Sequence, residues 1–83
     1  MPETEVGKVT HYFASISVAV VKLSGTLKQG DAIRIKGATS DFTQNVGEMQ
    51  IDHKPVAEAK KGQTIGLKVD EHAREHDSVF KVE

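Results

Sequence analysis

The chain has 83 residues, which is enough for one small domain with a thin core. A hydrophobic fraction of 37% indicates a folded protein, and the lack of cysteine excludes disulfides, thiolate nucleophiles and thiolate metal ligands. The net charge of -1, from 11 basic and 12 acidic residues, is unfavourable for a protein whose main partner is a phosphate backbone.

Short runs rich in Val and Ile, separated by Gly and polar clusters, predict an all-β domain with six strands. These runs cover residues 6–13, 16–23, 32–36, 42–51, 63–70 and 78–82. An open sheet of this size exposes unpaired backbone at its edges, and closing the sheet removes those edges. We therefore expect a single domain over residues 1–83 that forms a closed six-stranded antiparallel barrel, with residues 1–5 as a flexible N-terminus.

The first run places two sets of side chains on opposite faces. Alternation puts Val9, His11 and Phe13 on one face. Lys8 and Tyr12 fall on the other face. A nucleic acid base stacked on the tyrosine would then lie close to the lysine ammonium group, which could meet a phosphate.

The second and third runs differ in their alternation. The second run is apolar on both faces as far as Lys22, which predicts burial on two sides or mixed contacts. The third run alternates cleanly, with Ile33 and Ile35 facing inward. Arg34 and Lys36 are therefore expected on its outer face.

The later runs contain two glycines with positional meaning. The fourth run changes phase between Val46 and Met49, and we expect a β-bulge near Gly47, because glycine tolerates unusual dihedral angles. The fifth run places Gly66 on the outer face, where a bare backbone allows close approach of a loop or ligand. Residues 55–62 form the longest connection, for which one helical turn is predicted.

Two blocks of sequence carry a family resemblance. Residues 23–37 read Leu-Ser-Gly-Thr-Leu-Lys-Gln-Gly-Asp-Ala-Ile-Arg-Ile-Lys-Gly, and residues 59–67 read Ala-Lys-Lys-Gly-Gln-Thr-Ile-Gly-Leu. In this order and spacing they resemble the strand-linking signatures in the second domain of translation GTPases such as elongation factor Tu. The resemblance covers roughly residues 6–83 and implies a β-barrel that faces tRNA.

The chain also departs from that family. The family's second strand carries glycines near its start, whereas residues 15–21 contain none, and the 83 residues do not include a GTPase domain. In the full-length factors this domain helps to hold the aminoacyl end of tRNA, and the missing glycines alter that surface. A similar barrel also occurs as an accessory domain in some collagenase-like peptidases, so the resemblance implies a second function as well.

No catalytic or metal-binding pattern is complete in the sequence. The segment Gly25–Gly30 has the spacing of a phosphate loop, but Asp31 follows where that loop needs a lysine, and there is no G-x-S-x-G elbow. His72 and His76 stand four residues apart and would share a helix face suited to zinc, although a charged surface loop over residues 71–77 is the simpler interpretation. We expect no enzymatic activity, no cofactor and no metal site.

The front half of the chain is more basic than the back half. Residues 6–40 hold five basic residues and one acid, and residues 41–83 hold six basic and nine acidic residues. Ordinary solvated strand faces explain this distribution, and a basic patch across the first three strands is the alternative. On such a patch the residues that would bind RNA or another partner are Lys8, His11, Tyr12, Arg34 and Lys36. The competing interpretation places Phe13 in the core and leaves the tyrosine as a half-buried strand residue.

Two functions from different classes follow. The resemblance implies a non-catalytic module associated with tRNA or ribosomal RNA. The near-neutral charge favours a protein-interaction barrel with a protein partner, or an accessory barrel of a larger enzyme such as a collagenase-like peptidase. No apolar stretch approaches the ~20 residues that span a bilayer, and the acidic N-terminus lacks the features of a secretory signal. We therefore expect a cytoplasmic protein without membrane contact. The sequence does not indicate its oligomeric state.

Overall fold

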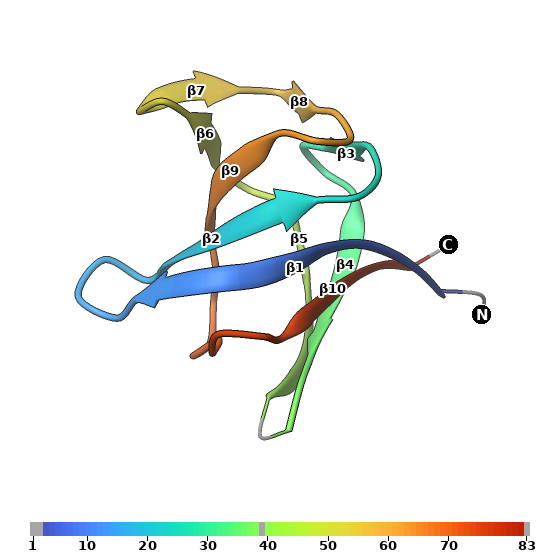
Figure 1. Ribbon diagram of the computed structural model, residues 1–83, viewed down its shortest axis with the longest axis vertical. Coiled ribbons are helices and arrows are strands. Elements are labelled where there is room, and N and C mark those ends of the chain that lie inside the picture. The colour runs from blue at the N-terminus through green and yellow to red at the C-terminus, as the bar shows by residue number, and fades with distance from the viewer. Residues whose placement is uncertain (1–2, 39, 83) are drawn as a thin grey trace.

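Strands dominate the computed structural model, which describes residues 3–38 and 40–82 (Figure 1). They are β1 (Glu3–Phe13), β2 (Val18–Leu23), β3 (Leu27–Lys28), β4 (Ala32–Lys36), β5 (Asp41–Asn45), β6 (Met49–Ile51), β7 (Lys54–Val56), β8 (Glu58–Ala59), β9 (Thr64–Lys68) and β10 (Ser78–Val82). One antiparallel sheet has the strand order β5-β4-β10-β1-β2-β9-β6-β7, and β3 pairs with β8 in a second sheet. The prediction of an all-β fold is confirmed.

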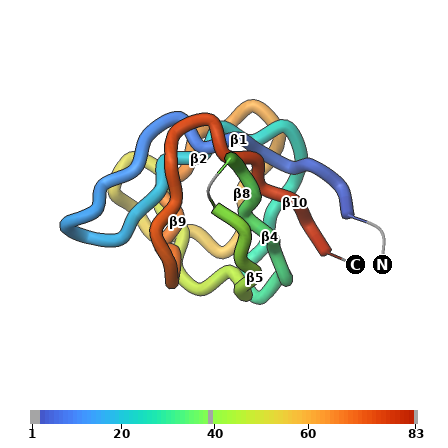
Figure 2. Tube along the Cα trace, turned by 90° about the horizontal axis from the view of Figure 1, so that it is seen from below, coloured from blue at the N-terminus to red at the C-terminus, as the bar shows by residue number. Residues whose placement is uncertain are grey.

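The large sheet is open in its backbone pairing. Its end strands, β5 and β7, do not pair with each other within the described ranges. The expected closed six-stranded barrel is therefore not found. The number of strands differs because the predicted run 42–51 divides into two strands and because the sequence pattern did not indicate β3, β7 and β8. Residues 46–48 connect β5, which pairs with β4, to β6, which pairs with β9, and the sheet curls around a common core (Figure 2).

The side chain of Gln44 bridges β5 to the segment that follows β9. Its Nε2 donates to the carbonyl oxygen of Lys68 at 3.0 Å, and its Oε1 accepts from the backbone N–H of Asp70 at 2.7 Å. The glutamine is 9% exposed, so both bonds lie largely away from water. A buried amide that is satisfied in this way joins two parts of the curled sheet without a backbone ladder between them.

The core is filled from the inward positions of alternating strands. On β4 the inward residues are Ile33 and Ile35, as the sequence predicted. The buried apolar side chains are Val6, Val9, Ala19, Val21, Leu23, Leu27, Ile33, Ile35, Phe42, Val46, Met49, Ala59, Ile65, Leu67, Val69, Ala73 and Val79.

Strand β1 contains two irregularities that strict alternation misses. Its register shifts between Glu5 and Gly7 against β10, and between Val9 and His11 against β2. The second shift inserts one residue and exchanges the faces of all residues that follow it in the strand. Phe13, which alternation placed with Val9, is consequently 45% exposed and not part of the core.

Three smaller expectations also change. Residues 3–5 are part of β1 rather than a flexible end, and residues 1–2 lie outside the described part of the chain. The phase change near Gly47 falls between β5 and β6 and interrupts the strand, where we expected a bulge within one strand. Residues 55–62 contain the end of β7 and all of β8 in place of a helical turn. In the described part of the chain, no helix has the length and apolar character needed to cross a membrane.

Candidate functional site

The bulge in β1 separates two residues that the sequence placed on one face. Lys8 precedes the bulge and is exposed on the outer face of the sheet. Tyr12 follows the bulge, packs against the core and has its ring centroid 4.5 Å from that of His72. The expected pairing of an aromatic face with the lysine ammonium is therefore wrong, because one inserted residue turns the tyrosine inward.

His11 lies on the outer face beside Phe13. The centroids of the two rings are 4.5 Å apart, and the planes meet at 61° in an edge-to-face contact. The imidazole Nδ1 is 3.4 Å from a carboxylate oxygen of Glu75. An exposed pair of this kind contributes little to stability, so the main effect of the contact is to place an aromatic surface at the end of β1.

Arg34 is held by acidic neighbours. Its Nε and Nη2 donate to the two carboxylate oxygens of Asp41, each at 2.8 Å, and its Nη1 donates to Glu3 at 3.3 Å. These hydrogen bonds raise the pKa of the arginine above its ordinary value, and the bonds from the arginine hold the pKa of Asp41 below its ordinary value. A phosphate would have to displace two carboxylates, so Arg34 acts here as a clamp between β1, β4 and β5.

Lys8 and Lys36 lie in one row that crosses the outer face of the sheet. Strand pairing takes this row through Lys22, Lys8, Ser78, Lys36 and Asp41. Residues directly opposite one another in an antiparallel sheet share a face, and all three lysines are exposed. We call Lys22, Lys8 and Lys36 the basic row. Sequence reasoning named two of its members and missed Lys22.

An apolar cleft of about 300 Å³ opens on the same outer face, between the β1–β2 and β6–β7 hairpins. Figure 1 shows the turns of both hairpins projecting on one side of the molecule. Phe13 and Ile16 line the cleft from the first hairpin and are 45% and 58% exposed. Val18 and Val20 of β2 and Gly66 of β9 line it from the sheet. The cleft therefore presents apolar side chains to solvent, next to a polar part of its lining formed by Gln50, Asp52, His53 and Thr64.

Gly66 keeps this surface open. It lies opposite Val20 on one side and Gln50 on the other. A Cβ at this glycine would lie 3.4 Å from Cγ1 of Val18, in ordinary van der Waals contact, and would cover part of the valine. The outward position and the bare backbone agree with the prediction made for this glycine.

The turn of the β6–β7 hairpin forms another wall of the cleft. Asp52 and His53 both line the cleft and have φ angles of 51° and 64°. Two consecutive left-handed residues in a two-residue hairpin loop favour sequences such as Asn-Gly or Asp-Gly, because glycine carries no Cβ penalty there. His53 thus occupies a position where glycine would be less strained.

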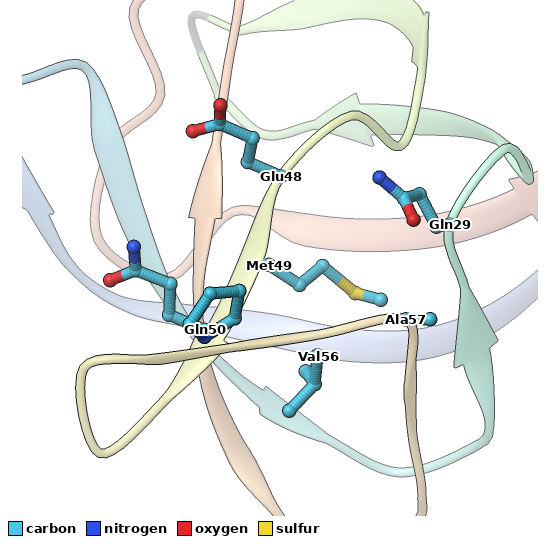
Figure 3. Close-up of a pocket in the computed structure, with 7 residues that line it drawn as sticks. Gln29, Glu48, Met49, Gln50, Val56 and Ala57 are labelled. Carbon is cyan, nitrogen blue, oxygen red and sulfur yellow. The ribbon is translucent and has the colours of Figure 1, made fainter.

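A second pocket, of about 360 Å³, is formed by loops around β6 and β7. Its lining consists of Gln29, Glu48, Met49, Gln50, Pro55, Val56 and Ala57 (Figure 3). Gln29 donates through Nε2 to the carbonyl oxygen of Gly47 and through its backbone N–H to that of Ala57, each at 2.8 Å. Of the lining residues only Glu48 is charged, so the pocket holds no acid–base pair. Its polar groups connect the loops to one another.

Comparison with known proteins identifies two related sequences and a solved structure of the same fold. No family model matches the chain. It is 42% identical over 77 residues to an uncharacterized protease of Methanocaldococcus jannaschii, with 92% of this chain and 19% of that protein covered. It is 37% identical over 81 residues to a collagenase of Porphyromonas gingivalis, with 95% of this chain and 22% of that protein covered. The solved C-terminal domain of a Geobacillus thermoleovorans protein described as a U32 peptidase matches with a TM-score of 0.90 at 19% identity, over 96% of this chain and 93% of that domain.

The chain shares the fold of this U32 peptidase domain. The expected identity, the second domain of a translation GTPase with its tRNA-facing function, is wrong, because the sequence relatives are proteases. The two motif blocks describe turns, in which Gly30 and Gly62 have φ angles of 92° and 90°. Such turns serve any short link into an antiparallel strand, so they indicate a fold and not a ligand.

The chain corresponds to only part of each related protein. The chain spans about a fifth of the length of the curated relatives it matches, 19% in one and 22% in the other. The sequence drew attention to two residues of the apolar cleft, Phe13 and Gly66, but not to the cleft itself. Its signal was present in the apolar outer positions Val18 and Val20, for which we expected burial on two sides or mixed contacts. It was also present in Ile16, which we assigned to the second strand and which lies in the turn before β2.

Proposed function

We propose that this chain is a non-catalytic accessory domain that docks through its apolar cleft onto the catalytic part of a protease of the U32 peptidase type. Similarity to segments of two proteases supports the proposal, since each segment makes up about a fifth of its protein. The fold likeness to a C-terminal peptidase domain supports it as well. A domain of this kind would act by contact with a larger protein, whether in the same chain or in another one.

The observation that carries the proposal is the exposure of Phe13 and Ile16 side by side. Full burial of a side chain of this size contributes about 1.5–3 kcal/mol, and the domain forgoes roughly half of this for each, since the two are 45% and 58% exposed. Exposed apolar residues that stand singly need no explanation, and two that border one cleft together support an interaction site there. A polypeptide partner that filled the cleft would recover this burial.

The turn of the β6–β7 hairpin gives independent support. A residue other than glycine in a strained backbone conformation costs about 1–3 kcal/mol, and such residues cluster at ligand-binding sites. His53 has a φ of 64° and lines the cleft. We infer that its imidazole contacts the docked partner.

We further propose that the domain behaves as a closed barrel in solution, which holds the strands around the cleft in fixed positions. The Gln44 bridge to Lys68 and Asp70 supports this, together with the 3.1 Å bond from the Lys68 N–H to the carbonyl oxygen of Glu48. Hydrogen exchange provides the test. The amide of Asp70 should exchange as slowly as the amides of the central strands, and exchange at the rate of a free loop would contradict closure.

The docking proposal is tested with the P. gingivalis collagenase from which the matched segment has been removed. The present chain, added in trans, should bind the truncated protein in a calorimetric titration. Ile16→Asp should weaken this binding by at least about tenfold without lowering Tm, because the side chain is 58% exposed in the free domain. Ala57→Arg, which fills the second pocket, is the matched control and should bind normally. Lack of binding by the unmodified chain, or an equal loss in both variants, would refute the proposal.

A further inference from the structure

Two lysines face each other across β1 and β2, and neither has an acid as its direct neighbour in the row. Lys8 lies opposite Lys22, and their other neighbours in the row, Ser78 and Thr64, are neutral. Like charges directly opposite each other destabilise a sheet. In the part of the chain that the structure describes, neither lysine takes part in an ion pair. The fold gains nothing from this pairing, so a role in contacts outside the domain accounts for it better.

The lysine pair borders a groove of about 460 Å³. The titratable groups that line it are Lys8, Lys22, Glu5 and His76, and the remaining lining is formed by Gly7, Val9, Thr10, Leu23 and Ser24. One carboxylate offsets only one of the two ammonium groups. The groove therefore has a net positive charge and room for a small anionic group.

The groove continues the apolar cleft along β2. Val18, Val20 and Lys22 occupy successive outward positions of this strand, with the buried residues Ala19 and Val21 between them. Outward positions on one strand are about 6.6 Å apart. A segment that fills the cleft therefore reaches the lysine pair one step farther along the strand.

We propose that Lys8 and Lys22 together bind a carboxylate of the partner segment that fills the cleft. This rests on the proposed docking function and adds the chemistry of the partner: an extended segment with two apolar side chains on one face and, two residues farther on, an Asp or Glu on the same face. An RNA backbone fits less well, because the chain has a net charge of -1 and Glu5 borders the groove. A single carboxylate brings one negative charge to two ammonium groups and one carboxylate, so it meets less repulsion than a row of phosphates would.

The first test measures affinity for the truncated collagenase at two salt concentrations. Lys8→Gln combined with Lys22→Gln should weaken binding about tenfold at 50 mM NaCl and less than about threefold at 500 mM NaCl, because salt screens the attraction. Lys60→Gln combined with Lys61→Gln removes the same charge from an exposed turn and should change binding less than about twofold. Equal losses in the two double variants would overturn the proposal while leaving the docking function intact.

A second test does not need the protease. The probe is the capped peptide Thr-Leu-Thr-Leu-Thr-Glu-Thr, and its matched control carries Gln in place of Glu. By NMR titration the Glu peptide should bind the unmodified chain at least about fivefold more tightly than the Gln peptide, and the ratio should fall to about one in the Lys8→Gln, Lys22→Gln variant. Equal affinity of the two peptides for the unmodified chain overturns the proposal. A lysine-dependent affinity for tRNA, with no dependence on the peptide carboxylate, would assign the groove to RNA instead.

Discussion

Replacing His53 with glycine should stabilise the domain and weaken docking at the same time. The residue has a φ of 64° in the two-residue turn between β6 and β7. A left-handed conformation costs a residue with a Cβ about 1–2 kcal/mol. Glycine avoids this cost, but its greater freedom in the unfolded chain lowers the free energy of unfolding by about 0.5–1 kcal/mol. The expected net gain in unfolding free energy is about 0.5–1 kcal/mol.

Calorimetry and binding together measure the two effects. For a domain of 60–100 residues, 1 kcal/mol corresponds to about 4–8 °C in Tm, so His53→Gly should raise Tm by about 2–8 °C. The same variant loses an imidazole from the wall of the apolar cleft. Binding to the truncated collagenase should weaken about fivefold, which is about 1 kcal/mol.

Ser17→Gly is the matched control for this experiment. Ser17 also has a left-handed backbone, with a φ of 55°, but it does not line the cleft. The control should raise Tm by a similar amount and leave binding unchanged. A drop in Tm for His53→Gly would show that the turn strain has been misjudged. Unchanged binding would show that the histidine is not part of the docking surface.

Two further predictions concern the frame around the cleft. Gln44→Ala leaves the Asp70 N–H without its acceptor and the Lys68 carbonyl without its donor. Urea unfolding should therefore show a free energy of unfolding lower by about 1–3 kcal/mol. An unchanged midpoint would mean that water replaces the bridge. The pKa of Asp41 is lowered in the fold by its hydrogen bonds from Arg34, so its contribution to stability is complete above about pH 4 and is lost as the pH falls through the folded pKa. A Tm series from pH 7 to pH 2 should therefore fall less steeply below pH 4 for Asp41→Asn than for the unmodified chain, and parallel curves would contradict the linkage.

Strict alternation predicted one strand well and failed in another for a physical reason. On β4 residues 33–36 each have one partner in β10 and one in β5, so Ile33 and Ile35 lie inside as the period of two requires. On β1 a bulge between Val9 and His11 adds one residue. Glycine did not mark this position, since Thr10 occupies it. A single sequence therefore offered no local sign of the exchange of faces that exposes Phe13.

The cleft could not be predicted because its exposure depends on the tertiary arrangement. The apolar outer positions of β2 are compatible with burial under a second layer or with an open surface. The strand pairing decides between them, since β2 lies between β1 and β9 with its outer face uncovered in this domain. Gly66 was visible in the sequence as an outward glycine, but the valine it leaves open, Val18, belongs to another strand.

The order of features along β2 restricts how a partner can bind. Val18 and Val20 offer apolar contact, and Lys22 adds charge at one end only. A partner segment bound in the reverse direction would place its carboxylate beside Phe13 and its apolar side chains beside the lysine pair, and would lose both kinds of contact. Apolar burial supplies most of the free energy of docking and has no preferred direction. The groove lined by Lys8 and Lys22 therefore mainly sets the direction in which the partner segment binds. Electrostatic complementarity contributes more to such specificity than to affinity.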